Sequence, residues 1–248
     1  MSPLVRVEPA AHPPGITTLT LDSPGNRNAL SAGLVGELRA ALAAAAADPA
    51  VRAVLLTHTG STFCSGADLK SPCEPADFLA LLREIAELPR PVVARVTGHV
   101  RAGGLGLLGA CDIAAAGPQS SYAFTETHLG VVPAVISAPL LPRLDPRAAS
   151  RYLLTAEAFD AAEAARIGLL TLHGEDVDEV LTPVLTGLRK AGPQALAETK
   201  RLVTAPLRAA LDRDGDALAE LSARHFASDE AREGITARFE RRDPSWAL

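Results

Sequence analysis

Two short segments of small residues are the parts of this chain best suited to chemistry. They lie about 30 positions apart, at Phe63–Leu69 (FCSGADL) and Gly98–Gly106 (GHVRAGGLG). Each leads from a turn into an expected helix start, where main-chain N–H groups lack an intrahelical acceptor and carry the positive end of the helix dipole. Such donors stabilise an oxygen atom that gains negative charge during a reaction. The spacing therefore predicts an oxyanion hole built from both segments.

The two segments belong to an ordered series of motifs that covers nearly the whole chain. The series comprises Arg27–Leu30, Phe63–Lys70, Gly98–Asp112, Phe124–Pro133, Arg151–Thr155, Phe159–Ala164, Ile167–Leu169, Asp229–Gly234 and Phe239–Pro244. In order and spacing it resembles the crotonase superfamily, the enoyl-CoA hydratases and isomerases. The resemblance implies an α/β fold, a ClpP/crotonase-like spiral of repeated ββα units with a C-terminal helical oligomerisation region. It also implies a coenzyme A thioester as substrate.

Three residues match the superfamily's reacting positions. Ala67 and Gly103 fall where the resemblance places the two N–H groups around the thioester carbonyl. Glu126 falls at the position of the second catalytic glutamate, from which a carboxylate moves a proton to or from the carbon next to the thioester. For an arbitrary glutamate at this place we would expect a surface helix cap, because Thr125-Glu126 opens a short segment that ends at Gly130.

The remaining matched positions imply contacts to coenzyme A. In the superfamily the corresponding loops meet the adenine and pantetheine parts through backbone groups. The Lys70 side chain could also meet a phosphate, and Arg241 could reach the ribose phosphate of a ligand bound to a neighbouring subunit. The expected coenzyme-binding residues are Asn28, Ala29, Ala67, Asp68, Leu69, Lys70 and Arg241.

One departure limits how much of the chemistry carries over. Two-glutamate hydratases have their first catalytic glutamate where this chain has Gly106, and the 20 positions from Gly106 to Glu126 match the family spacing. We therefore expect a hydratase-type lyase that uses Glu126 as its acid and base, with a one-glutamate enoyl-CoA isomerase as the alternative. A non-catalytic acyl-CoA-binding protein is the alternative of another class. For the nearby polar residues Glu74, Asp77, His99 and His128 we expect structural or solvent-exposed positions.

The Gly104–Gly109 stretch also reads G-x-G-x-x-G, the pattern of a dinucleotide-binding turn. Such a turn needs its first glycine at the end of a strand and a full crossover helix before the next strand. Gly104 instead comes seven residues after the expected strand end at Thr97, and a strand-like run begins again at Asp112. The spacing disfavours a nicotinamide or flavin site.

Composition narrows the other possibilities. The chain has 248 residues, of which 48% are hydrophobic and 21% charged, and its net charge of −5 gives no reason to expect nucleic-acid binding. The three cysteines have no C-x-x-C spacing, which favours a reducing, cytoplasmic location. We expect no metal, no permanently bound cofactor and no membrane contact, since no apolar stretch approaches 18 residues.

Periodicity and capping signals predict the elements that must hold these residues. Strands are expected at 4–7, 16–21, 52–58 and 91–97, and helices at 32–47 (capped by Ser31) and 75–88. Helices then dominate, at 133–141, 146–154, 161–167, 177–190, 193–211, 216–226 and 230–241. We divide the chain into a catalytic core at 1–190 and a helical region at 191–248. The resemblance implies that this second region mediates assembly into a trimer or a dimer of trimers.

Overall fold

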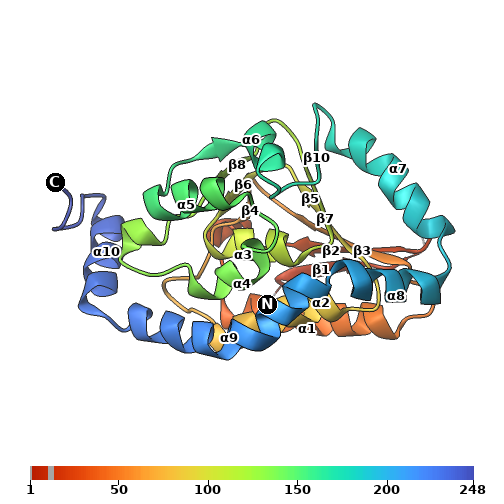
Figure 1. The fold of residues 1–248 in the computed structure, drawn as a ribbon, viewed down its shortest axis with the longest axis horizontal. Coiled ribbons are helices and arrows are strands. Elements are labelled where there is room, and N and C mark those ends of the chain that lie inside the picture. Colours follow the sequence, from red (N-terminus) through yellow and green to blue (C-terminus); the bar gives the residue numbers. More distant parts are fainter. Residues whose placement is uncertain (1, 11–13) are drawn as a thin grey trace.

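A six-stranded sheet forms the base of the structure, a computed structural model that describes residues 2–10 and 14–248 (Figure 1). Its strands, in spatial order, are β1 (Val5–Glu8), β2 (Ile16–Leu21), β3 (Ala53–His58), β5 (Val92–Val96), β7 (Ile113–Ala116) and β10 (Leu172–His173). All neighbours pair in parallel except β1 and β2. Parallel strands are covered on both faces, which explains why the central strands β3, β5 and β7 are nearly continuous runs of apolar residues. The four predicted strands are confirmed.

A second, smaller sheet is built from strands of two or three residues. Its order is β4 (Thr62–Cys64), β6 (His99–Arg101), β8 (Ser121–Ala123) and β9 (Phe159–Asp160), with β4, β6 and β8 parallel. Each of the three parallel strands follows a long strand of the first sheet directly along the chain: β3, β5 and β7 respectively. This alternation of sheets, with helices in between, is the predicted ββα repeat.

Ten α-helices complete the described part of the chain. They are α1 (Ala32–Ala47), α2 (Pro75–Glu87), α3 (Gly103–Ala110), α4 (Ala134–Leu140), α5 (Pro146–Thr155), α6 (Ala161–Arg166), α7 (Val177–Lys190), α8 (Pro193–Val203), α9 (Ala205–Phe226) and α10 (Asp229–Glu240). The short 3-10 helices are η1 (Pro24–Asn26) and η2 (Thr127–Leu129). As predicted, the Ser31 side chain caps α1, accepting from the Leu34 N–H at 3.2 Å.

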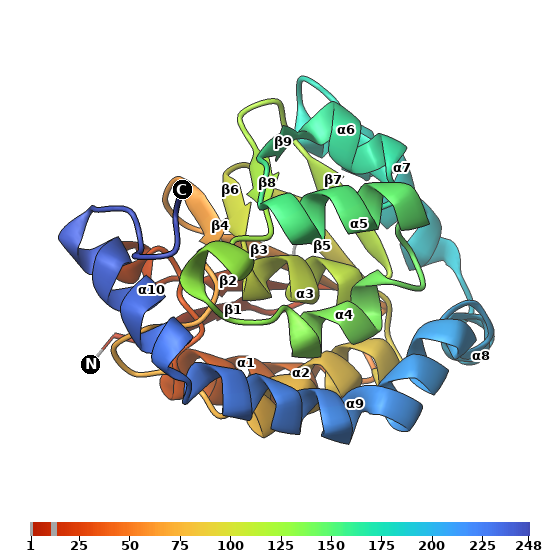
Figure 2. The ribbon, with the colours of Figure 1, turned by 60° about the vertical axis from the view of Figure 1, so that its left-hand side comes forward.

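The C-terminal helices lie against the core. Figure 2 shows α9 running along α1 and α2, with α4 above it, and α9 packs directly on α2 and α4. The predicted break between helices 193–211 and 216–226 was wrong. The break falls at Thr204, before Pro206, and one helix then continues through Gly215 to Phe226. Gly215 lies inside the helix and allows close packing, since an added Cβ there would lie only 3.1 Å from the Leu79 side chain of α2.

A buried ion pair between Lys200 and Asp112 holds α8 against the chain segments that lead into β5 and β7. Lys200 is 4% exposed, and its ammonium lies 2.8 Å from Asp112 Oδ2 while donating to the carbonyls of Ile85 and Arg90. Asp112 in turn accepts from the Val92 N–H at 2.7 Å. One lysine thus joins α8 to the ends of α2, β5 and β7. Within residues 2–10 and 14–248, the helices are all too short or too polar to span a bilayer.

Candidate active site

Three chain segments leave the small sheet side by side at one edge. Thr62 and Cys64 of β4 pair with His99 and Val100 of β6, and Val100 of β6 pairs with Tyr122 of β8. Neighbouring strands lie about 5 Å apart, so the chain beyond each parallel strand starts about 5 Å from the next. The segments that follow are those singled out in the sequence, at Gly66–Ala67, Ala102–Gly103 and Phe124–Glu126.

The first two segments make close backbone contact. A Cβ added to Gly66 would lie 2.8 Å from the Ala102 Cβ and 3.3 Å from the Gly103 nitrogen, and Gly66 has a φ of +89°. Only glycine combines that conformation with that approach. Ala67 and Gly103 therefore lie near each other, as the oxyanion-hole prediction requires.

Both predicted donors are free. The chain before Ala67 is held by a bond from the Leu30 N–H to the Gly66 carbonyl, and the chain after it by a bond from the Asp68 N–H to the Leu30 carbonyl. Within the described ranges, neither the Ala67 N–H nor the Gly103 N–H has an acceptor. Gly103 is the first residue of α3, where an N–H has no intrahelical partner.

Ala102, at the N-cap of α3, carries backbone strain at this site. Its φ of 48° and ψ of −121° are an unusual combination for a residue with a Cβ. The conformation is held on one side by the Ala102 N–H, which donates to the Ala123 carbonyl at 3.1 Å, and on the other by the Leu105 N–H, which donates to the Ala102 carbonyl. Strain of this kind is held only where the surroundings fix the chain, and it orients the Gly103 N–H.

Glu126 is buried, which overturns the surface-cap interpretation. It precedes η2 but makes no side-chain cap bond, and it is only 7% exposed. Its Oε2 has no hydrogen-bond partner among the described residues. Burial raises the pKa of the Glu126 carboxyl to about 7, opposed only by a backbone hydrogen bond of Glu126 itself. A carboxyl with this pKa exchanges a proton readily near neutral pH.

Gly106, where two-glutamate hydratases have their first catalytic glutamate, is surrounded by apolar side chains. A Cβ added to Gly106 would lie 2.7 Å from Ile136 Cγ2 and 3.3 Å from Phe78 Cζ. The same Phe78 ring, on α2, also lies 3.6 Å from a Cβ added to Gly103. Sequence reasoning missed both side chains, because nothing in the order of residues shows that α2 and α4 meet the same face of α3.

The glycines of the G-x-G-x-x-G stretch lie inside α3 rather than in a turn. Added Cβ atoms would meet Cys64 at Gly104, Ile136 at Gly106 and Leu140 at Gly109. These glycines let α3 pack closely between β4 and α4. The geometry agrees with the expectation that this stretch is not a dinucleotide-binding turn.

The expected coenzyme-binding residues fall into two groups. Asn28 is fully buried, and its side chain accepts from the Ser23 N–H and donates to the Thr59 and Thr62 carbonyls. Ala29 is also buried. Since the whole residue is buried and its N–H donates to the Ser23 carbonyl, Asn28 serves to hold the loop before Ala29 in shape.

The second group lies on the surface. Asp68 and Leu69 are partly exposed, and the Asp68 carboxylate accepts from Asn26 Nδ2 and from the Lys70 and Ser71 N–H groups, which shapes the loop after Ala67. The charged side chains of Lys70 and Arg241 are exposed, Arg241 at the left-handed C-cap of α10.

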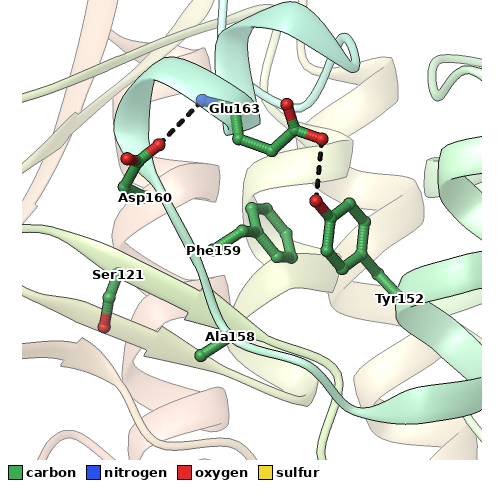
Figure 3. Close-up of a pocket in the computed structure, with 6 residues that line it drawn as sticks. All are labelled: Ser121, Tyr152, Ala158, Phe159, Asp160 and Glu163. Atoms are coloured by element: carbon green, nitrogen blue, oxygen red, sulfur yellow. Dashed lines mark hydrogen bonds between the residues drawn. The ribbon is translucent and has the colours of Figure 1, made fainter.

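The other polar candidates lie at the surface, as expected. Glu74, Asp77, His99 and His128 are exposed, and Asp77 pairs with Arg39 at 3.5 Å. A surface pocket of about 380 Å³ lies elsewhere, between β8, β9, α5 and α6 (Figure 3). There Tyr152 donates to Glu163, which pairs with Arg166 at 2.6 Å. The pocket contains none of the expected site residues.

Comparison with known proteins agrees with this architecture. Residues 12–247 match the family model described as enoyl-CoA hydratase/isomerase. The crystal structure of an enoyl-CoA hydratase from Mycobacterium avium is 50% identical, with a TM-score of 0.94 and all of both chains covered. Crotonyl-CoA hydratase of Syntrophomonas wolfei is 30% identical over 92% of each chain. Carnitinyl-CoA hydratase from Mycobacterium avium has 25% identity and a TM-score of 0.86, with 99% of both chains covered.

The ββα architecture defines the class of molecule as a crotonase-fold α/β protein. Within that class, the chain belongs to the enoyl-CoA hydratase/isomerase family and is an acyl-CoA-processing enzyme.

Proposed function

We propose that this enzyme adds water to a 2-enoyl-CoA, with Glu126 as its acid and base and the Ala67 and Gly103 N–H groups as its oxyanion hole. The observation that carries the proposal is the buried Glu126 carboxylate, whose Oε2 has no hydrogen-bond partner in the described part of the chain. Glu126 follows β8, whereas the Ala67 and Gly103 N–H groups follow β4 and β6. These three strands pair in parallel, so the three groups leave the small sheet at the same edge. Proton donor and oxyanion donors are thus available to one thioester.

The chemistry follows from where charge develops. Hydration adds hydroxide to C3 and a proton to C2, and as the C3–O bond forms, electron density moves to the thioester oxygen. Two N–H donors aimed at that oxygen stabilise the enolate character of the transition state. Glu126 then accepts a proton from the attacking water and delivers a proton to C2. A pKa near 7 allows both steps, since neither protonation state is strongly favoured at neutral pH.

Isomerisation is the second candidate, and the packing of Gly106 favours it. Ile136 and Phe78 occupy the space beside Gly106, so no second carboxylate acts from that position. Moving a double bond between C2–C3 and C3–C4 needs only one base that carries a proton between C2 and C4, together with one oxyanion hole. Glu126 and the two N–H groups satisfy that requirement.

The assembly and the coenzyme contacts form part of the same proposal. The helical region at 191–248 carries large exposed apolar side chains, with Leu202 76%, Val203 70% and Phe239 55% exposed, which supports a role in trimerisation. Residues Ala29, Asp68, Leu69 and Lys70 would line the coenzyme on loops that the buried Asn28 holds in shape, with Arg241 near a phosphate. Three free cysteines support a cytoplasmic location.

Isotope labelling separates the two reactions. The enzyme is incubated with a panel of 2-enoyl- and 3-enoyl-CoA thioesters in water labelled with heavy oxygen and deuterium, and products are read by mass spectrometry. Hydration predicts uptake of both labels by a 2-enoyl-CoA. Uptake of deuterium without heavy oxygen would reject hydration and support isomerisation as the activity. A panel in which no thioester takes up either label and none has its double bond moved, checked by chromatography against standards, would contradict both candidates.

A further inference from the structure

The helix α10 packs directly on η2, the short helix that follows Glu126. At two glycines the backbones of the two elements approach each other closely. A Cβ added to Gly234 of α10 would lie 2.5 Å from both the carbonyl carbon and the carbonyl oxygen of Leu129. A Cβ added to Gly130, which follows η2, would lie 2.6 Å from the Glu230 carbonyl oxygen. Each element thus supplies one glycine that lets the other approach.

This contact connects to Glu126 through two hydrogen bonds. The Leu129 N–H donates to the Glu126 carbonyl at 2.9 Å, and the Val131 N–H donates to the same carbonyl at 3.1 Å. Gly130, between them, has a φ of +68°, which favours glycine. Because of these two hydrogen bonds, a displacement of the Leu129 carbonyl also displaces the backbone of Glu126, three residues earlier in the chain.

The helix itself is fixed at both ends. The Ser228 side chain caps its first turn, accepting from the Ala231 N–H at 3.1 Å. Near its end, Glu233 pairs with Arg242 at 2.7 Å and accepts from the Ser245 N–H. Ala231, Gly234 and Ala237 are all buried, so the face toward the body of the protein consists of small residues. A helix held in this way is a firm support for η2.

We propose that Gly234 is a positioning residue for Glu126, and that α10 holds the loop after Glu126 in the place where its carboxylate can reach the substrate. This inference rests on the proposed catalytic role of Glu126. It assigns the last helix of the chain a task within the active site, in addition to the assembly role proposed for the helical region.

The direct test is Gly234→Ala. The added methyl group would lie about 1 Å closer to the Leu129 carbonyl than ordinary contact allows, so η2 or α10 must move by about that amount. A misplacement of about 1 Å can cost roughly 100-fold in rate. We expect kcat to fall at least roughly tenfold with KM within about threefold of the parent value, since the oxyanion donors lie on other segments.

Gly187→Ala is the matched control. Gly187 is an exposed glycine of α7, with no atom within 4 Å of an added Cβ. Helix α7 lies at the opposite end of the molecule from α10 (Figure 1). This control should keep its activity. A folded Gly234→Ala variant with unchanged kcat, or an equal loss in Gly187→Ala, would overturn the proposal.

A double-mutant cycle with Glu126→Gln tests whether Gly234 acts through Glu126. If it does, Gly234→Ala lowers the rate of the parent enzyme but not the residual rate of the Glu126→Gln enzyme. A further loss of similar size in the Glu126→Gln background would contradict the inference. If Glu126→Gln itself keeps full activity, the proposed function fails instead, so the two failures are distinguishable.

Ser228→Ala provides a second variant if Gly234→Ala does not fold. It removes the cap of α10 without adding atoms and so loosens the first turn, which holds Glu230 against Gly130. We expect kcat to fall about threefold with KM unchanged. A kcat equal to that of the parent enzyme would overturn the proposal.

Discussion

Gly106→Ala should destabilise this protein, although alanine is the better helix former. The new methyl carbon would lie 2.7 Å from Ile136 Cγ2 and 3.2 Å from Ile136 Cβ, compared with about 3.5–4.0 Å for ordinary contact. Ile136 is 3% exposed and branched at Cβ, so its methyl group cannot swing away. Overpacking of this kind costs about 1–3 kcal/mol, and the helix gains about 1 kcal/mol from replacing glycine. We expect a net loss of about 1 kcal/mol.

The same substitution should have the opposite sign once Ile136 is shortened. Ile136→Ala alone leaves a cavity and costs about 2–5 kcal/mol. In that background the methyl group of Gly106→Ala partly fills the cavity and stabilises the protein by about 1 kcal/mol. The coupling free energy between the two positions is then about 2 kcal/mol, well above the error of additivity.

Urea unfolding followed by circular dichroism measures these free energies. Gly36→Ala is the control, because Gly36 is an exposed glycine of α1 with no atom within 4 Å of an added Cβ. It should stabilise the protein by about 1 kcal/mol. If Gly106→Ala stabilises by as much, or if the sign does not reverse in the Ile136→Ala background, the packing argument is wrong.

The functional counterpart is Gly106→Glu, which supplies the carboxylate of two-glutamate hydratases. Because Ile136 and Phe78 already crowd the Cβ position, the rest of a glutamate side chain has no room beside the thioester. We expect weaker binding of crotonyl-CoA and no gain in hydration. Faster hydration than in the parent enzyme would show that the position is simply a lost second carboxylate.

Three further predictions concern Glu126, Gly103 and Lys200. Burial raises the pKa of Glu126 from 4.5 to about 7, so the free energy of unfolding falls as pH rises through that range. Glu126→Gln should therefore stabilise the protein by up to about 3 kcal/mol at pH 8 but little at pH 4. Equal effects at both pH values would contradict this. Gly103→Pro removes one oxyanion donor and should lower kcat/KM at least roughly 100-fold with the fold intact by circular dichroism; full activity would place the carbonyl elsewhere. Lys200→Met leaves Asp112 buried without its cation and should cost about 3–5 kcal/mol in urea unfolding, whereas a loss below about 1 kcal/mol would refute the importance of the pair.

Local signals in the sequence predicted the long elements well. The cap at Ser31 and the apolar period predicted α1 with its observed bounds. The predicted bounds of α7 and β2 also agree with the structure. The error in the C-terminal region has a physical cause. Gly215, near several charged residues, resembles a break, but its missing side chain serves close packing on Leu79 instead.

The family resemblance implied a ββα repeat, but the residue pattern did not predict the individual strands of the small sheet, which leads into the candidate site. Strands of two or three residues are too short to show a period, and β4, β6 and β8 form because the longer strands β3, β5 and β7 bring them together. The family resemblance selected Ala67, Gly103 and Glu126 as candidates, but it could not show that Glu126 is buried. Burial depends on elements distant in the sequence, as does the contact between Gly234 and Leu129.

The measurement that tests the central claim most directly is the turnover of an enoyl-CoA by Glu126→Gln. The substitution keeps the size of the side chain and removes its ability to carry a proton. The account predicts that the folded variant still binds the CoA thioester, measured by calorimetry, while turnover falls at least roughly 100-fold. Near-normal turnover in a correctly folded Glu126→Gln enzyme would contradict it.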